Sequence, residues 1–280
     1  MKPPDLQNDR YELRERVGSG AYATVWRAVD LENGEAVAVK LLRTDAMTPD
    51  EVRRLIQEVE ILSVLNHPCI VRTFTAGVSK AGTPYVVMEW VDGMTLREQL
   101  ERTPVLPLAD TLAIVEQVCS ALVEAHMAGV VHRDVKPENV LLAAGKERRV
   151  KLVDFGTAKR LDPSAPVLTV DNRILGTPHY MAPERASGKP VGGAADVYAV
   201  AVMTYEMLEG RMPFDGTSPL MIVALHIKEP PPRMRRATLA VEQAIGWGLA
   251  KDPVQRPSAE QYVERLRHAA RLTSGRARDW

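Results

Sequence analysis

The amino-acid sequence predicts an α+β fold, with strands in its N-terminal part and helices in most of the remainder. Three observations support this prediction. Residues 11–39 alternate between apolar and polar side chains, apolar residues recur mostly at helical spacing over 52–65, and a longer apolar helical stripe follows over 112–123. A chain of 280 residues, of which 45% are hydrophobic, is long enough for one large two-lobed unit or for two ordinary domains.

The composition argues against several classes of protein. The 36 Lys and Arg residues balance the 36 Asp and Glu residues, so no overall field attracts nucleic acid, and nucleic acid is not an expected partner. Cys69 and Cys119 lie in apolar surroundings without metal-ligand spacing, and we expect both to be reduced. The N-terminus has no apolar segment, and the longest apolar run, 197–208, is too short to span a bilayer. The chain is therefore expected to be soluble and cytoplasmic, without a membrane segment.

Three antiparallel strands are predicted within residues 11–42, and two more strands at 70–74 and 85–88 precede a hinge at 89–91. The first turn reads Gly-Ser-Gly-Ala-Tyr-Ala, and its glycines would let backbone N–H groups approach a phosphate chain closely. Taken alone, this turn is better explained as an ordinary hairpin. The third strand contains Val-Ala-Val-Lys, and Glu58 on the following helix is the candidate ion-pair partner of Lys40.

The stretch at 131–156 carries the clearest chemical pattern. Asp134, Lys136 and Asn139 follow one short apolar segment, and Asp154 begins an Asp-Phe-Gly tripeptide after a hairpin-like link. Acids, an amide and a lysine at this spacing match the groups that surround a transferring phosphoryl group. Either His-Arg-Asp or Asp-Phe-Gly alone could occur by chance in a surface loop. Their joint occurrence, in order and correctly spaced, argues against chance.

From Tyr11 to about His268 the chain resembles Hanks-type, or eukaryotic-like, serine/threonine protein kinases, and most closely the bacterial members. The resemblance rests on the glycine-rich turn, the Val-Ala-Val-Lys strand, the stretch at 131–156 and the sequence at 176–184 that ends in Ala-Pro-Glu. It implies a two-lobed protein-kinase fold. A small β-rich lobe with one main helix, together with the hinge, would occupy residues 1–91, and a larger, mostly helical lobe 92–268. Residues 269–280 are predicted to form a basic tail.

The resemblance implies a kinase that transfers the γ-phosphoryl group of ATP to Ser/Thr hydroxyls of protein substrates, including its own activation segment. Mg²⁺ is the expected metal, with Mn²⁺ as the alternative. The implied catalytic residues are Asp134, which orients the substrate hydroxyl, the metal ligands Asn139 and Asp154, and the charge-neutralising set Lys136, Lys40 and Glu58. The implied nucleotide-binding residues are Val17, Gly18, Ser19, Gly20, Ala21, Val25, Ala38, Lys40, Met88, Glu89, Val91 and Leu141. Arg256 is expected to pair with Glu184 and close the substrate platform.

A regulatory site is predicted around Arg133, because a cation beside the catalytic acid usually needs an anion from the activation segment. Lys159 and Arg54 are the other basic candidates. The predicted anions are Thr169 and Asp171, at offsets where bacterial relatives often carry two autophosphorylated threonines. Thr169 is predicted to be autophosphorylated and to raise activity, while Asp171 gives a basal rate. The alternative is that Asp171 is a solvated loop acid.

Two other functions stay open at the level of the sequence. A pseudokinase scaffold would share the fold without turnover, and Ala23, which replaces the third glycine of the phosphate-binding turn, gives this alternative some support. A small-molecule kinase is the second alternative, against which the Glu184–Arg256 platform argues. The sequence also leaves open whether the protein dimerises and whether the chain is a stand-alone enzyme or an excised domain.

Overall fold

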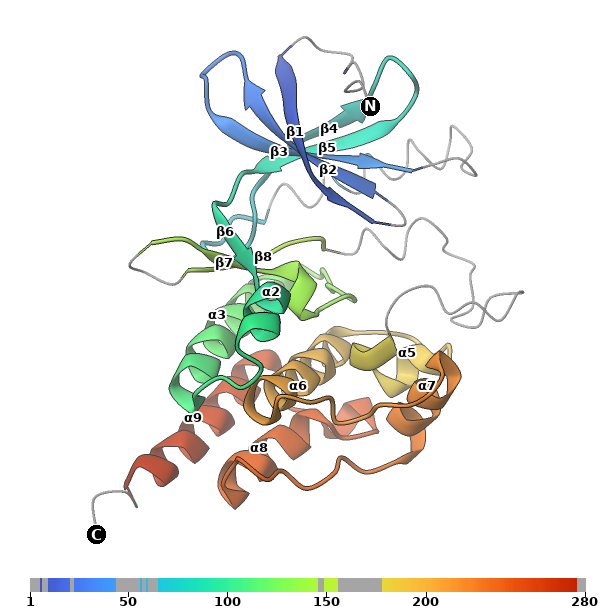
Figure 1. Ribbon diagram of the computed structural model, residues 1–280. Helices are drawn as coiled ribbons and strands as arrows, with labels where there is room; N and C mark the ends of the chain where they lie inside the picture. Colours follow the sequence, from blue (N-terminus) through green and yellow to red (C-terminus); the bar gives the residue numbers. More distant parts are fainter. Residues whose placement is uncertain are drawn as a thin grey trace. The chain divides into compact units, whose positions relative to one another are not determined.

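The computed structural model describes residues 6, 10–20, 23–43, 56, 59, 65–145, 149–155 and 178–275 (Figure 1). The described residues form two compact units that divide between Asp92 and Gly93, next to the predicted end of the hinge at 91. Of the helix predicted over 52–65, Ile56, Val59 and Leu65 are described; the first two are helical and Leu65 is not.

The first unit is built on an antiparallel sheet. Its strands are β1 (Tyr11–Ser19), β2 (Ala23–Asp30), β3 (Ala36–Leu42), β4 (Thr73–Val78) and β5 (Pro84–Glu89). They lie in the order β1-β2-β3-β5-β4, and every neighbouring pair is antiparallel. The three antiparallel strands predicted at the N-terminus are therefore confirmed, and the two later strands extend the same sheet.

The two faces of this sheet differ because side chains alternate along each strand. One face carries a cluster of buried apolar side chains, made of Leu6, Tyr11, Leu13, Trp26, Ala28, Val37, Val39, Leu41, Tyr85 and Val87. On the other face, Lys40 of β3 lies opposite Val25 of β2, and Ala38 lies opposite Met88 of β5. The sheet thus separates its core from a face that holds several of the predicted nucleotide-binding residues.

The second unit contains a small sheet and most of the helices (Figure 1). Its strands β6 (Gly93–Thr95), β7 (Val140–Ala143) and β8 (Val150–Leu152) are antiparallel and lie in that order. The longer helices are α2 (Leu96–Arg102), α3 (Leu108–Met127), α6 (Gly193–Glu209), α7 (Pro219–Lys228), α8 (Leu239–Gly248) and α9 (Ala259–Gly275). Short helical segments are η1 (Pro137–Asn139), η2 (Pro178–Tyr180), α5 (Pro183–Ala186) and η3 (Pro253–Gln255). A sheet-based first unit and a mostly helical second unit confirm the predicted α+β fold.

Helix α6 is central to the second unit. It packs against α3, α8 and α9, and its side chains are buried from Ala195 to Glu209. A helix that is apolar on all sides is expected in the interior of a large unit. Asp196 and Glu206 are acidic exceptions on this helix, and a buried carboxylate needs partners because leaving it unpaired is unfavourable. The partners of both carboxylates lie around the candidate site.

Residues 269–275, which the sequence predicts to begin a basic tail, belong to helix α9. Helix α9 continues to Gly275, and Ala269 and Ala270 are buried. The helix packs against α3 and α8. Beyond residue 268 its buried stripe includes small alanines, which give a weak apolar signal in a sequence rich in arginine.

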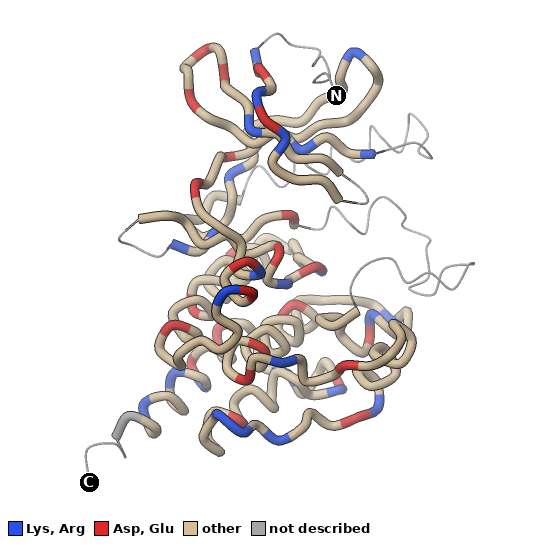
Figure 2. Tube along the Cα trace, in the orientation of Figure 1, with Lys and Arg blue, Asp and Glu red and all other residues tan. Residues whose placement is uncertain are grey.

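Charged residues of both signs are interspersed along both units (Figure 2), as expected for a formal net charge of +0. Cys119 is buried and Cys69 is partly buried, and neither of these described cysteines forms a disulfide. Among the residues that the structure describes, no helix combines the length and the apolar character that crossing a membrane requires.

Candidate active site

The loop that carries Asp134 is held by a buried carboxylate on α6. Asp196, which is 1% exposed, accepts hydrogen bonds from the backbone N–H groups of His132 (2.9 Å) and Arg133 (2.7 Å). It also lies 2.9 Å from Nε2 of His126 near the end of α3. These donors satisfy the buried carboxylate and fix the backbone directly before Asp134.

His132 links this loop to the backbone that leads to Asp154. Its side chain is fully buried, and burial lowers its pKa, so the ring is neutral near pH 7. The neutral ring donates through Nε2 to the carbonyl of Val153 (2.8 Å), while Nδ1 accepts the backbone N–H of Asp134 (3.2 Å). Phe155 packs on the same ring, with centroids 4.5 Å apart. One imidazole therefore joins the two stretches that carry the predicted acids.

Asp134, Lys136 and Asn139 lie within hydrogen-bonding distance of one another. Nζ of Lys136 donates to Oδ2 of Asp134 at 2.7 Å, and Nδ2 of Asn139 donates to the same oxygen at 3.0 Å. Nδ2 of Asn139 also donates to the backbone carbonyl of Asp134 at 2.7 Å. The side chain of Asp134 remains 26% exposed. The arrangement presents an oriented carboxylate that a substrate hydroxyl can reach.

Asp154 and Asn139, the predicted metal ligands, are joined through the backbone. The N–H of Val153 donates to the carbonyl of Asn139 (3.0 Å). Asp154 has a φ of +65°, in the left-handed region that Asp adopts more readily than most residues. Because Asn139 uses Nδ2 to bind Asp134, its amide oxygen is the atom left for a metal. Carboxylate and amide oxygens are hard ligands of the kind that Mg²⁺ and Mn²⁺ prefer, so these residues fit a divalent cation.

Arg133 also has a left-handed backbone, with a φ of +68°. Its carbonyl accepts a hydrogen bond from the guanidinium of Arg185 on α5. Burial lowers the pKa of Arg185, and the charge of Arg133 lowers it further, against the opposing effect of nearby carboxylates. Within the described part of the chain, the buried Nε of Arg133 has no hydrogen-bond partner. Two neighbouring arginines, one with an unfilled buried donor, form an environment that an anion would satisfy.

The predicted pair of Glu184 and Arg256 is confirmed. Nη1 and Nη2 of Arg256 donate to the two carboxylate oxygens of Glu184 at 2.7 and 2.8 Å, and the side chains are 0% and 3% exposed. Arg256 also donates to the carbonyls of Ala250 (2.7 Å), Ala194 (3.0 Å) and Lys251 (3.1 Å). Such complete hydrogen bonding is what a buried ion pair requires. The pair anchors α5 to the start of α6 and to the loop that follows α8.

In the first unit, several of the predicted nucleotide-binding residues share the sheet face opposite the buried cluster. Lys40 lies between Val25 on β2 and Val86 on β5. Ala38 is buried, whereas Val25, Lys40 and Met88 are partly buried. A small side chain at 38 between partly buried neighbours suits the flat ring of a nucleotide base better than a bulky side chain would.

The glycine-rich turn closes the β1–β2 hairpin. Gly18 pairs with Val25, and the N–H of Gly20 donates to the carbonyl of Ala23 at 2.8 Å. Neither glycine has a positive φ, and among the described residues an added Cβ would meet nothing closer than 3.6 Å at Gly18 or 3.9 Å at Gly20. The hairpin itself therefore does not require glycine at either position. This favours the interpretation that the glycines leave room for a ligand over that of an ordinary turn.

The remaining predicted site residues are spread over both units. Glu89 ends β5 and Val91 follows it, and both are partly buried. Val17 is 46% exposed on β1, and Leu141 lies on β7 of the second unit. Several predicted residues lie outside the described residues, namely Ala21, Arg54, Glu58, Lys159, Thr169 and Asp171.

Sequence reasoning missed several residues that hold the site together. They are Arg97, His126, Tyr180, Arg185, Asp196 and Glu206. A signal existed for Asp196 and Glu206, because a carboxylate within an otherwise apolar helix must be buried with a partner. The cationic residues and the tyrosine gave no comparable signal, since their partners are distant in the sequence.

A family model described as the protein kinase domain matches residues 11–266. The serine/threonine-protein kinase PknB of Mycolicibacterium smegmatis is 36% identical over 277 residues, which cover 95% of this chain and 44% of that protein. A probable serine/threonine-protein kinase PknB of Corynebacterium glutamicum is 40% identical over 227 residues, which cover 80% of this chain and 35% of that protein. The chain thus spans less than half the length of these curated relatives.

Solved structures also resemble this chain. The crystal structure of the Mycobacterium tuberculosis PknI kinase domain superimposes with a TM-score of 0.75 at 28% identity, covering 96% of this chain and 99% of that chain. Nearly the whole length of that solved domain therefore corresponds to this chain.

Proposed function

Because the chain belongs to the protein kinase domain family, whose members use ATP and a divalent metal ion, we propose that it acts as a serine/threonine protein kinase. The proposed reaction transfers the γ-phosphoryl group of ATP to a Ser or Thr hydroxyl of a protein. The observation that carries the proposal is the oriented, partly exposed carboxylate of Asp134 between Lys136 and Asn139. The relatives named above are serine/threonine-protein kinases, which supports this class of acceptor.

In the proposed mechanism, Asp134 accepts the proton of the substrate hydroxyl. The oxygen of that hydroxyl forms a bond to the γ-phosphorus at the same time. The bond from that phosphorus to the β–γ bridging oxygen breaks, and ADP leaves with the electron pair. Lys136, 2.7 Å from Asp134, supplies positive charge beside the reacting groups. Lys40 is proposed to bind the α- and β-phosphates, with Glu58 as its ion-pair partner.

Asn139 and Asp154 are proposed to hold the metal, with Mg²⁺ preferred and Mn²⁺ as the alternative. A bound divalent ion neutralises phosphate charge. The adenine edge is proposed to meet the backbone of Glu89 and Val91, with Met88 behind it. The other proposed nucleotide contacts are Val17, Gly18, Ser19, Gly20, Ala21, Val25, Ala38 and Leu141.

Replacement of Asp134 by Asn, or of Lys40 by Met, tests this proposal. Each change removes a charge with little change in volume, so transfer to a protein substrate should fall by at least about 10³-fold while the fold persists. Transfer of radiolabelled phosphate with Mg²⁺ and with Mn²⁺ measures the rate, and thermal unfolding checks the fold. Lys80→Met, at an exposed lysine of the first unit, is the matched control and should keep the wild-type rate.

Near-native turnover in Asp134→Asn or Lys40→Met would contradict the assigned roles. A wild-type chain that binds ATP but transfers no phosphate with either metal would favour the pseudokinase. Transfer to a small molecule but to no polypeptide would favour the small-molecule kinase. We also propose a cytoplasmic location for this domain, because its proposed use of ATP fits that compartment.

A further inference from the structure

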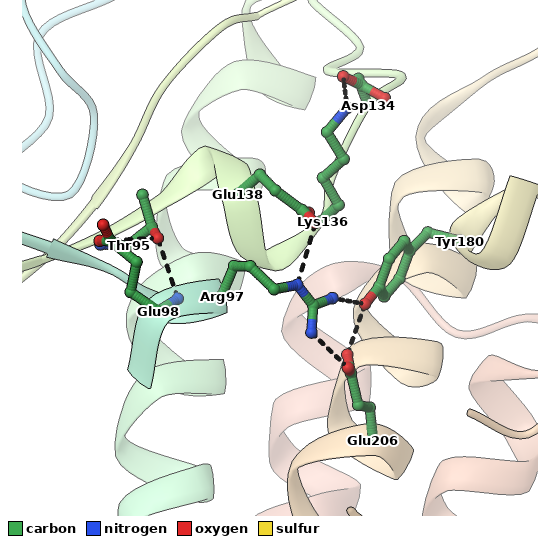
Figure 3. A network of polar contacts seen from close by, with 8 residues as sticks. All are labelled: Thr95, Arg97, Glu98, Asp134, Lys136, Glu138, Tyr180 and Glu206. Carbon is green, nitrogen blue, oxygen red and sulfur yellow. Dashed lines mark hydrogen bonds and ion pairs between the residues drawn. The ribbon is translucent and has the colours of Figure 1, made fainter. Parts of the chain in front are cut away.

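A cluster of four side chains connects the catalytic loop, which carries Asp134 and Asn139, to the protein-binding platform, which is the segment around Glu184 (Figure 3). Arg97 comes from α2, Glu138 from η1, Tyr180 from η2 and Glu206 from α6. All four belong to the second unit. In Figure 3 the guanidinium of Arg97 lies in the middle, with the three other side chains pointing toward it.

Each nitrogen of the Arg97 guanidinium has its own acceptor. Nε donates to Oε1 of Glu138 at 3.0 Å, Nη1 to Oε1 of Glu206 at 2.7 Å, and Nη2 to Oη of Tyr180 at 2.5 Å. Oη of Tyr180 in turn donates to Oε2 of Glu206 at 2.5 Å. A planar guanidinium holds three acceptors at fixed directions, whereas a lysine ammonium is a compact point charge that cannot reproduce this geometry.

The cluster is buried beside α6 and more open beside the catalytic loop. Tyr180 is 6% exposed and Glu206 7%, whereas the side chain of Glu138 is 43% exposed. Burial, reinforced by Glu206, raises the pKa of Tyr180 far above its ordinary value, so the phenol remains a hydrogen-bond donor. The buried ion pair of Arg97 with Glu206 is therefore the stronger contact. Solvent screens the ion pair with the exposed Glu138, which is weaker.

The contacts of Arg97 with Glu138 and with Tyr180 involve elements that the proposed phosphoryl transfer needs. Glu138 directly precedes Asn139 on η1, so this contact restrains the segment that carries a proposed metal ligand. Tyr180 stands shortly before Glu184, whose pairing with Arg256 anchors the platform. The shared support is α6, the helix that also fixes the catalytic loop.

We infer that Arg97 is a positioning residue for the proposed reaction, acting on the catalytic loop through Glu138 and on the protein-binding platform through Tyr180. The inference rests on the proposed function. Loss of the guanidinium should slow phosphoryl transfer and weaken use of the protein substrate. Nucleotide affinity should change little, because none of the three partners of Arg97 is among the proposed nucleotide contacts.

The test compares Arg97→Met and Arg97→Lys with Arg102→Met, which removes an exposed arginine from the last turn of the same helix. Both Arg97 variants should lower kcat for a protein substrate by about tenfold or more and raise its KM by about threefold or more. The Kd for ADP should stay within about twofold of wild type. Arg102→Met should match wild type in all three quantities.

Two further variants separate the contacts. Glu138→Gln should lower kcat with little change in the KM for the protein substrate, and Tyr180→Phe should mainly raise that KM. Each effect should shrink when the change is made in Arg97→Met, because the partner is already lost. A residue that served only to keep the unit folded would lower the melting temperature without this division between kcat and KM.

Native kcat and KM in the Arg97 variants would overturn the inference, as would a loss confined to ADP binding or one equalled by Arg102→Met. Increased use of substrates with basic side chains by Arg97→Met would overturn it too, because the acidic groups would then form a substrate subsite. If Arg97→Met fails to fold, Arg97→Lys and the two partner variants decide the matter. An inactive wild type overturns the proposed function, whereas an active wild type with neutral Arg97 variants overturns this inference alone.

Discussion

His226 is a titratable side chain held uncharged inside the helical unit. It is fully buried, its Nδ1 lies 2.9 Å from the hydroxyl of Tyr198, and its ring packs edge-on against Phe214 at 4.8 Å. Burial, reinforced by the charge of Lys251, lowers its pKa to about 3. In the unfolded chain the same ring titrates near its ordinary pKa of about 6.5. Between these values the folded protein binds fewer protons at this position than the unfolded chain.

Acid should therefore destabilise the protein through His226. As the pH falls below about 6.5, the unfolded state gains a proton that the folded state does not, so the free energy of unfolding drops by up to about 1.4 kcal/mol per pH unit. Urea unfolding between about pH 7.5 and pH 5 measures this slope. His226→Phe should give a shallower slope, and His268→Gln, at an exposed position on α9, should keep the wild-type slope. Equal slopes in wild type and His226→Phe would contradict this account.

At the level of elements, α8 shows how neighbouring helices decide which glycines matter. A Cβ on Gly248 would lie 2.6 Å from the Cβ of Ala201 on α6 and 2.8 Å from the ring of Tyr262 on α9. Within the part of the chain that the structure describes, a Cβ on Gly246 would meet nothing within 4 Å. The first glycine permits close approach of three helices, whereas the second only adds flexibility to the unfolded chain.

These two glycines should respond oppositely to the same substitution. Gly248→Ala should destabilise the protein by about 1–3 kcal/mol through overpacking. Gly246→Ala should stabilise it by about 0.5–1 kcal/mol through higher helix propensity. Urea unfolding of both variants provides the measurement, with each serving as the control for the other. A similar loss in both would show that α8 tolerates no alanine for reasons other than contact with Ala201 and Tyr262.

The elements differed in how well their sequences predicted them. Alternation in β1, β2 and β3 was informative because one sheet face carries the buried apolar cluster, whereas side chains on the other face, such as Val25 and Lys40, are only partly buried. The end of α9 was not, because its buried residues Ala269 and Ala270 have side chains too small to create a clear apolar pattern. The residue at which such a helix ends depends on its packing against neighbouring helices. The sequence of the helix alone therefore gives little indication of that residue.

On the scale of the whole molecule, the proposed active-site residues of the loop were predictable because their spacing is local. Asp134 and Asn139 are 5 positions apart, and their hydrogen bond follows from one short loop. Arg97 and Glu206 are 109 positions apart, so no local pattern could pair them. Their contact depends on how α2 and α6 pack, which the sequence of either helix alone does not determine.

Regulation is proposed to act through Arg133, because its buried Nε, which has no hydrogen-bond partner among the described residues, suits an anion. We predict that Thr169 is autophosphorylated and raises activity, and that Asp171 gives a basal rate without it, with Lys159 and Arg54 as further cations. A phosphate brings about −1.5 to −2 charges against one for an aspartate, so Asp171 should substitute only in part. Mass spectrometry after incubation with Mg-ATP, with rates for Thr169→Ala and Asp171→Ala, provides the test.

Ser164→Ala, five positions before Thr169, is the control. It should keep the phosphorylation of Thr169 and the wild-type reaction rate. An unmodified Thr169, or wild-type rates in both Thr169→Ala and Asp171→Ala, would refute this proposal.

The carboxylate of Asp196 also determines when, during synthesis and folding, the catalytic loop can take its final structure. It lies 64 and 63 positions after the two residues, His132 and Arg133, whose N–H groups it accepts. During synthesis the catalytic loop leaves the ribosome first, and this acceptor arrives only when α6 has been made and packed. Closing so long a segment costs conformational entropy that burial of α6 must offset. A nascent polypeptide can therefore contain every proposed catalytic residue of the loop and still lack kinase activity. Folding of the helical core should precede any phosphorylation of other proteins.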